Sequence, residues 1–374
     1  MIKILGMGLI ALFLLSIQRS LYARFWQRHL KITVSFGLDH IFEGEQGELK
    51  EIIENKKRLP LPMLKVKFKT DRHLQFGNEK GSRTTDQYYR NDIFRIGGGE
   101  RVTRTLKFNA GKRGYYTVEE ISLVASDLFF LSQLVAEQTV KTELYVYPRP
   151  CDDSRLRQSL VRLNGEILAK RHLLEDPFEY RGIREYQPYD DMRSINWKAT
   201  AKTGDLKVNQ KNYTALKSVR IFFNIQDNNI LKKEESVEMS LRIVATLCMF
   251  FLRQGMQVSC YGNGIDIITH NPLSIDARAS EGQMDTIYRA LARIDTGQPT
   301  ADFTEVFEES LFLEAKGSFT CFVAPNQYED FVGLLKRYEE TGNSFVWFYP
   351  VLGGKVPELP VGLEKRIEVI GFDA

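Results

Sequence analysis

Charged and aromatic side chains that could do chemistry crowd one stretch of the sequence, from Glu175 to Lys211. This stretch contains seven acidic and seven basic residues, so its charge is balanced. A surface for nucleic acid or anionic lipid would carry one sign of charge. Two interpretations stay open: charge pairs that fasten a connector to a domain, or a recognition or active-site surface. The second would use Arg184, Tyr186, Asp190, Arg193, Asn196 and Trp197.

The fastening interpretation predicts that Trp197 is a buried anchor. It also predicts that Arg184 and Arg193 pair with carboxylates such as Asp176, Asp190 or Asp191. The adjacent carboxylates Asp190 and Asp191 could instead act as general acid and base, although such pairs in turns more often cap helices or form salt bridges.

The stretch RGIREYQPYDDMRSINWKATAKTGDLKV resembles the signature of the Domain of Unknown Function 58 family. Its arginine-x-tyrosine, arginine-x-isoleucine-asparagine-tryptophan and small-residue basic tail correspond to residues 184–186, 193–197 and 199–202. Tyr189 stands where the family has a glycine before Asp190, so the local turn differs from the family pattern. Weaker similarities at residues 113–115 and 147–149 extend the resemblance over nearly the whole chain.

The composition is that of an ordinary globular protein long enough for two domains, at 374 residues. A net charge of +3 with 26% charged residues gives no argument for a nucleic-acid partner. The four cysteines lack zinc-site spacing, and Cys248, Cys260 and Cys321 lie in apolar runs typical of reduced core residues. The five histidines are scattered singly, so no cofactor, metal site or small-molecule substrate is evident.

Residues 4–17 form an uncharged apolar run that Leu21, Tyr22, Phe25 and Trp26 extend toward the length of a membrane span. A signal peptide is the alternative, but no small-x-small cleavage pattern follows the run. Basic residues lie mainly after it, which predicts a membrane anchor with the soluble part in the cytoplasm. The resembled family usually has two such helices, whereas one is visible here.

From about residue 31 to 147, short stretches of alternating polarity and glycine-rich turns predict an antiparallel β-sandwich. Arg104 falls on an otherwise apolar strand face, which indicates an exposed edge or rim. Residues 150–175 predict a helical linker with one apolar face. From Ser218 onward, strands and helices alternate, as in a parallel sheet covered by helices on both faces. A turn at residues 262–264 followed by residues 265–267 predicts a short hairpin edge strand.

This C-terminal pattern resembles the von Willebrand factor A fold, in which an aspartate-x-serine-x-serine loop after the first strand holds a divalent cation. Here Asn224, Gln226 and Asn228 replace those ligands, and Asp227 supplies the only carboxylate of the loop. Divalent hard cations favour carboxylate oxygens, so we predict a degenerate site without metal. Asp302 could add a ligand, but a helix start explains it equally well.

The predicted domains are a membrane anchor (1–28), a β-sandwich (31–148), a linker with the signature segment (150–214) and a von Willebrand factor A-like domain (215–374). The family resemblance implies a MoxR-type AAA+ ATPase as partner, in the assembly or maturation of other proteins. We therefore expect a membrane-anchored, non-enzymatic adaptor. The alternative is a metal-assisted hydrolase that uses Asp190, Asp191 and Arg193.

Overall fold

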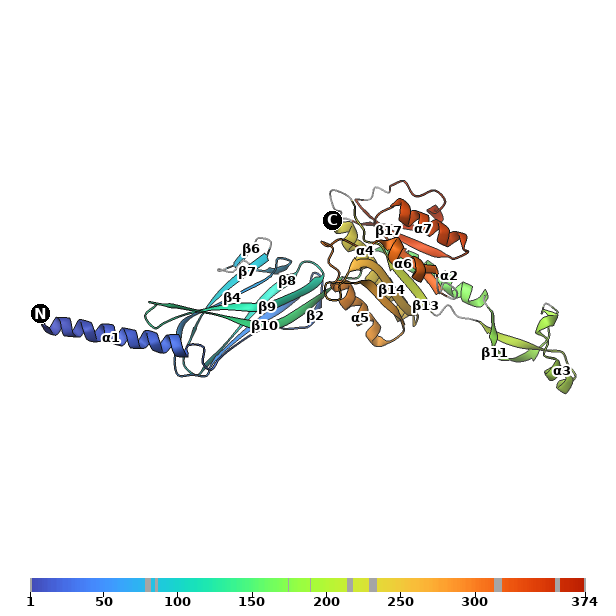
Figure 1. Cartoon of the computed structure of the whole chain (residues 1–374). Helices are drawn as coiled ribbons and strands as arrows, with labels where there is room; N and C mark the ends of the chain where they lie inside the picture. The colour runs from blue at the N-terminus through green and yellow to red at the C-terminus, as the bar shows by residue number, and fades with distance from the viewer. Residues whose placement is uncertain are drawn as a thin grey trace. The chain divides into compact units, whose positions relative to one another are not determined.

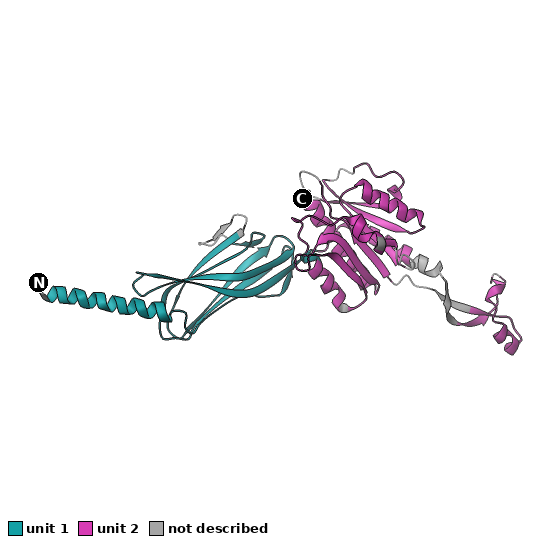
Figure 2. Ribbon diagram, in the orientation of Figure 1, with its two compact units in different colours: residues 1–149, 291–293 teal, residues 150–290, 294–374 magenta. Residues whose placement is uncertain are grey.

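A computed structural model of the chain describes residues 2–77, 82–84, 87–173, 175–188, 190–213, 218–228, 234–312, 318–353 and 357–372. Side chains are not described at residues 2, 82–84, 87, 168–181, 210–213, 281 and 309. The chain forms two compact units, Met1–Arg149 with Leu291–Arg293, and Pro150–Ala290 with Ile294–Ala374 (Figure 2).

The first unit consists of one long helix and two sheets (Figure 1). The helix is α1 (Ile2–Phe25). The four-stranded antiparallel sheet has the order β1 (Leu30–Phe36), β3 (Gln46–Asn55), β8 (Glu100–Ala110) and β5 (Leu74–Phe76). The six-stranded sheet has the order β2 (His40–Phe42), β10 (Gln133–Tyr147), β9 (Gly114–Ser126), β4 (Leu61–Asp71), β7 (Gln87–Ile96) and β6 (Ser82–Thr84).

One apolar core lies between the two sheets and makes them a sandwich. Leu49 and Ile53 of the smaller sheet share it with Val66 and Ile121 of the larger one. Every second residue of β3 is buried, the alternation expected of a strand with one face on a core. The antiparallel sandwich expected from the sequence is thus confirmed, although the two strands expected at 115–118 and 121–123 are one strand, β9.

Helix α1 is joined to this core at its C-terminal end and exposed along the rest of its length. Tyr22 and Trp26 are buried in the sandwich core, and the Tyr22 hydroxyl donates to the Pro60 carbonyl at 2.9 Å. Lys3–Phe25 is long and apolar enough to cross a membrane, and its most apolar part has no buried residues. The apolar N-terminal helix predicted from the sequence is therefore present and could serve as an anchor or a signal sequence.

The sandwich core also contains a buried cluster of charged residues. Arg90 donates Nε to Asp92 Oδ2 at 2.7 Å, and Arg104 donates to Asp92 Oδ1 at 2.6 Å. Glu51 lies opposite Arg104 across β3 and β8 and is fully buried. Burial first, and the neighbouring Asp92 charge second, raise the pKa of Glu51 to about 8. Arg104 therefore faces a buried carboxylate. Among the described strands, β8 has a second neighbour, β5, only at residues 108–110, so Arg104 also lies on an open edge of the sheet, as expected.

The second unit is built on a six-stranded sheet, in the order β15 (Pro272–Arg278), β14 (Gln257–Ile265), β13 (Ser218–Phe223), β16 (Ser318–Val323), β17 (Phe345–Leu352) and β18 (Ile367–Phe372). Only β15 is antiparallel to its neighbour. Counted along the chain, the order is 3-2-1-4-5-6, the doubly wound arrangement in which ligands bind beyond the carboxyl ends of the strands at the reversal point. That point lies between β13 and β16.

Helices accompany the sheet, as the alternation in the sequence predicts (Figure 1). They are α2 (Ser154–Leu173), α4 (Glu234–Arg253), α5 (Glu281–Ala292), α6 (Phe303–Phe312) and α7 (Glu329–Glu340). A short helix η2 (Glu364–Arg366) precedes β18. The predicted apolar face of the linker helix is buried at Leu156, Leu160, Leu163 and Ile167, and Glu368 of β18 binds Ser159 and Arg162. Cys248, Cys260 and Cys321 are free and buried, as expected.

The predicted turn at residues 262–264 is wrong, because β14 continues through these residues, with an irregular register against β15 between Gly262 and Ile265. A Cβ atom on Gly262 would lie 1.9 Å from the Phe223 ring, and one on Gly264 would lie 2.6 Å from Ile294. These glycines therefore permit close packing within a strand. Glycine in a sequence can indicate such packing as well as a turn. The antiparallel edge strand does exist, but at Pro272–Arg278.

We predict that Glu51→Gln removes a pH dependence from the sandwich. The folded-state pKa of Glu51 lies above its ordinary value of 4.5, so its contribution to stability is fully present below that value and is lost as pH rises through about 8. Hydrogen exchange of β3 amides in the full chain should therefore slow in Glu51→Gln relative to the parent at about pH 9, with little change at about pH 5. Glu54→Gln, on the outward side of β3, is the control. Equal changes in both variants would contradict the prediction.

Candidate functional site

The signature segment folds into a small module of its own, which we call the signature module (residues 182–209). Its frame is an antiparallel pair, β11 (Glu175–Glu185) and β12 (Lys207–Tyr213), in which Arg184 lies opposite Val208. Between these strands lie the 3-10 helix η1 (Met192–Ser194) and helix α3 (Trp197–Thr203). Figure 1 labels α3. A hairpin was not predicted from the sequence, because charged residues obscure the alternation of these strands.

A bidentate ion pair closes the turn that follows β11. Arg184 Nη1 and Nη2 donate to Asp190 Oδ2 and Oδ1, both at 2.6 Å, and Asp190 Oδ2 also accepts the Gln187 backbone N–H at 2.8 Å. The hydrogen bond from Arg184 is the main cause that lowers the pKa of Asp190. Asp190 is therefore held ionised with both oxygens engaged, so it is poorly suited to act as a general acid or a metal ligand.

Asn196 holds the start of α3 and ties it to β12. Its Oδ1 accepts the Ala199 N–H at 2.9 Å as a helix N-cap, and its Nδ2 donates to Asn209 Oδ1 at 2.7 Å. Its backbone N–H donates to the Lys207 carbonyl at 2.8 Å, and the Lys207 N–H donates to Thr200 Oγ1 at 3.0 Å. The asparagine of the sequence signature thus fixes the position of the residue that follows it.

That residue, Trp197, is 65% exposed, so the expectation of a buried anchor is wrong. Among the side chains described in the module, only Ile195 and Val208 are buried, and they face each other in an isolated bridge. Such a small core cannot cover an indole ring at the first position of α3. Three more large apolar side chains are exposed on the same module: Ile183, Met192 and Leu206.

The other predicted site residues hold the backbone or face solvent. The Tyr186 N–H donates to the Leu206 carbonyl at 2.9 Å, and Asp191 Oδ1 accepts the Arg193 backbone N–H at 3.0 Å as the cap of η1. Arg193 is exposed, and its predicted ion pair is not found with any described carboxylate. Tyr189 and the side chain of Asp176 lie outside what the structure describes.

A second candidate site lies at the carboxyl ends of β13 and β16, where the sheet order reverses. Asn224 directly follows β13, and its Oδ1 accepts the Gln226 N–H at 2.9 Å and Asn263 Nδ2 at 2.8 Å. Asn263, fully buried in β14, also donates to the Ala301 carbonyl and accepts the Ile225 N–H at 2.9 Å. Neutral amides therefore occupy the position where a cation-binding loop would have carboxylates. Asn263 was missed, because the flanking glycines were interpreted as a turn.

The remaining loop residues bind other loops of the same unit. Asn326 donates to the Gln226 carbonyl at 2.7 Å, and the Asn228 N–H donates to the Tyr328 hydroxyl at 2.7 Å. Asp227 lines an adjacent hollow of about 430 Å³ together with residues 296–300. Asp302 caps α6 by accepting the Thr304 N–H at 2.8 Å, in line with the helix-start interpretation. Among the described residues, no three His, Cys, Asp or Glu side chains gather as metal ligands would.

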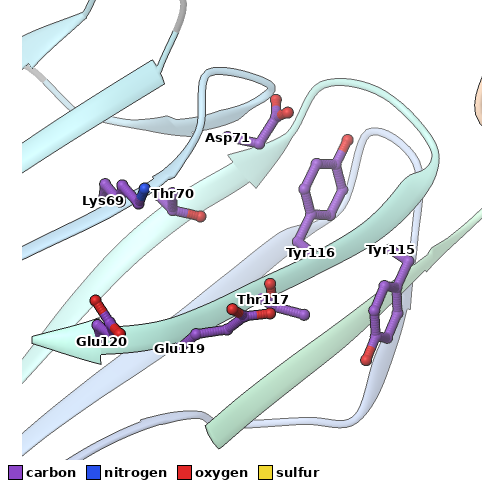
Figure 3. A pocket seen from close by; sticks show the side chains of 8 residues that line it. All are labelled: Lys69, Thr70, Asp71, Tyr115, Tyr116, Thr117, Glu119 and Glu120. Carbon is purple, nitrogen blue, oxygen red and sulfur yellow. The ribbon is translucent and has the colours of Figure 1, made fainter. Parts of the chain in front are cut away.

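A hollow of about 410 Å³ lies on the sandwich, against the end of β4 and along β9 (Figure 3). Three of its polar residues, Asp71, Tyr115 and Tyr116, have partners within the sandwich. The Tyr115 hydroxyl donates to Glu143 Oε2 at 2.6 Å, the Tyr116 hydroxyl donates to the Lys112 carbonyl at 2.8 Å, and Asp71 accepts the His73 N–H at 2.8 Å. These three residues are therefore engaged in the sandwich structure itself.

No protein-family model matches the chain, and no curated protein matches it. Among solved structures, it is similar to a non-cellulosomal cohesin from Archaeoglobus fulgidus, with 17% identity over 31% of this chain and 91% of that one and a TM-score of 0.21. A cohesin of Acetivibrio cellulolyticus scaffoldin B is 11% identical over 31% and 98%, with a TM-score of 0.22. A CARDB domain from Pyrococcus furiosus is 17% identical over 31% and 90%, with a TM-score of 0.20.

We predict that Trp197→Ala leaves the module folded, whereas Asn196→Ala loosens it. Loss of an exposed side chain changes stability by within about 0.5 kcal/mol. Loss of an asparagine cap costs about 1 kcal/mol, which corresponds to roughly fivefold faster exchange of the α3 amides. Hydrogen exchange resolved to α3 measures both effects. Faster exchange in Trp197→Ala than in Asn196→Ala would restore the buried-anchor interpretation.

We also predict that Asn263→Asp destabilises the second unit more than Asn224→Asp does. Asn263 donates two hydrogen bonds that a carboxylate cannot make, and each acceptor left without a donor costs about 1–3 kcal/mol. Asn224 uses its oxygen in both of its side-chain bonds given above, so aspartate preserves them. Thermal unfolding of the two matched variants tests this difference. Equal melting temperatures would show that the Asn263 amide does not support the loops.

Proposed function

We propose that the chain is a membrane-anchored, non-enzymatic adaptor that docks a partner protein through the exposed apolar side chains of its signature module. The observation that carries the proposal is the exposure of Trp197 on a framework fixed by Asn196 and by the Arg184–Asp190 pair. Water-exposed tryptophan on an ordered framework is typical of residues that dominate protein–protein interfaces. The recognition interpretation of the segment is thereby favoured over the fastening one.

The partner we propose is a MoxR-type AAA+ ATPase. This choice rests on the resemblance of residues 184–202 to the Domain of Unknown Function 58 family, whose members are commonly encoded beside such ATPases. Within that family, the second unit would be a von Willebrand factor A-like domain. A parallel sheet with one early antiparallel edge strand, β15, supports that assignment.

We propose that α1 anchors the protein with both units in the cytoplasm. Lys3 precedes the apolar run, whereas Arg19, Arg24 and Arg28 follow it, and the positive-inside rule places the more basic flank on the cytoplasmic side. The helix extends over 24 residues, or about 36 Å, enough to span a hydrocarbon core of about 30 Å.

The competing proposal is a metal-assisted hydrolase built on Asp190, Asp191 and Arg193. It is less well supported, because Asp190 already accepts three hydrogen bonds and Asp191 caps η1. A metal ligand needs lone pairs that these bonds occupy. Titration of the full chain with magnesium and manganese discriminates the two proposals. A saturable site in the micromolar range that is lost in Asp191→Ala would favour the hydrolase.

We predict that Trp197→Ala weakens binding of the partner ATPase by about 30-fold, the equivalent of about 2 kcal/mol for a central interface residue. Met192→Ala should have a smaller effect in the same direction. The measurement is affinity, together with stimulation of ATP hydrolysis, using the full chain in lipid nanodiscs. Ile268→Ala, in the exposed turn between β14 and β15, is a matched apolar control and should bind like the parent.

Unchanged binding in Trp197→Ala, with the parent itself binding the ATPase, would place the docking surface elsewhere. If the parent does not bind, the proposed ATPase is the wrong partner. A loss in Ile268→Ala as large as that in Trp197→Ala would argue against a surface confined to the signature module.

A further inference from the structure

The turn between β9 and β10 exposes four consecutive large apolar residues, which we call the apolar turn: Leu128, Phe129, Phe130 and Leu131. Their exposed fractions rise from 46% at Leu128 through 55% and 60% to 64% at Leu131. Four such residues in sequence, two of them phenylalanine, are unusual at a loop tip, where small and polar residues normally occur. Nothing in the proposed docking of a partner by the signature module uses them.

The apolar turn has a defined conformation, which hydrogen bonds to the Asp127 carboxylate stabilise. Asp127 is fully buried, its Oδ1 accepts the Leu131 N–H at 2.7 Å, and its Oδ2 accepts the Ser132 hydroxyl at 3.0 Å. The Phe130 N–H donates to the Asp127 carbonyl at 3.2 Å, and Phe130 takes a left-handed φ of 60°. A non-glycine residue in that region is uncommon and costs conformational energy. The turn therefore keeps its apolar side chains outward by specific bonds.

The apolar turn lies at the end of the sandwich from which α1 extends, as Figure 1 shows for the connection between β9 and β10. The Asp127 carboxylate interacts electrostatically with Tyr22, one turn of helix before the end of α1. Tyr22 and Trp26 belong to the sandwich core, so the end of the helix and the base of the turn are held in one unit. The turn and the last turns of α1 are thus neighbours.

Basic and aromatic side chains surround the same end of α1. The guanidinium groups of Arg24 and Arg28 lie 5.8 and 5.9 Å from the centre of the Phe25 ring, and both arginines are exposed. Arginine and aromatic side chains together mark the headgroup level of a membrane, where the cation meets lipid phosphate and the ring meets the acyl boundary. A bilayer crossed by α1 would therefore have its interface beside the apolar turn.

We infer that the apolar turn inserts into the lipid interface next to α1 and forms a second membrane contact of the sandwich. This inference rests on the proposed anchoring by α1. Lipid is favoured over a protein occupant because the turn lies beside the helix that we propose to cross the membrane. Two contacts, a helix and a turn, would also restrict the tilt of the sandwich against the bilayer, which one helix alone does not fix.

The test places an environment-sensitive fluorophore, NBD, on Phe129→Cys in the full chain. Cys151→Ser serves as the background, since the other three cysteines are buried. The labelled protein is reconstituted into vesicles of phosphatidylcholine and phosphatidylglycerol, with and without lipid spin-labelled near the headgroup. Leu38→Cys, an exposed apolar position beside Asp39, is the control. The Asp39 carbonyl accepts the Tyr145 N–H, so Leu38 lies near the far end of β10, about 40 Å from the turn.

We expect blue-shifted emission and several-fold stronger quenching by spin-labelled lipid at position 129 than at position 38, in protein that floats with the vesicles. Protein that floats but has a water-exposed probe at position 129 would overturn the inference and leave the α1 anchor intact. Blue-shifted emission without quenching would also overturn it, because another protein surface would then cover the turn. Protein that fails to float would overturn the anchor and the inference together.

Discussion

The hydrogen bond between the side-chain amides of Asn263 and Asn224 is the constraint on which the chemistry of the second unit depends. It joins the end of β13 to β14, and Asn263 extends the connection to the Ala301 carbonyl before α6. Loops at the reversal point of a doubly wound sheet ordinarily form a ligand crevice. Here neutral groups satisfy one another, so the loops close without a cation, and this position offers few groups to do chemistry.

With that position closed, the exposed side chains of the signature module become the strongest candidate for function. The Arg184–Asp190 pair shows how ionic groups can hold the backbone of the proposed docking surface without reacting. Its bonds are bidentate and consume both carboxylate oxygens, which fixes the turn after β11. From the sequence we expected charged residues to fasten a connector to a domain, whereas Arg184 and Asp190 belong to the same module. They fasten the module to itself, whereas Trp197, which was expected to be a buried anchor, is exposed to solvent.

Periodicity predicted the sandwich and the alternating second half, because most of their apolar residues obey a regular period. It missed β3, where Glu51 and Asn55 occupy inward positions and so interrupt the apolar alternation. A pattern of residue types cannot reveal that a carboxylate is buried among Arg90 and Arg104, which come from strands distant in sequence. The bond from Asn263 to Asn224 likewise joins residues far apart in sequence, so the tertiary fold alone brings them together.

Groups of exposed apolar side chains occur on the signature module and on the apolar turn. The two differ in sequence, but their backbones are fixed in the same way. Trp197 follows the capping Asn196, and the apolar turn follows Asp127, whose carboxylate binds its backbone. In both places an Asn or Asp side chain fixes the backbone while large apolar groups stay in water, an arrangement that exposes the protein to aggregation. A fixed backbone lowers the entropy lost on binding. Burial of these apolar groups against another surface is therefore favourable. We therefore propose a different covering surface for each set: lipid for the turn beside α1, and protein for the signature module.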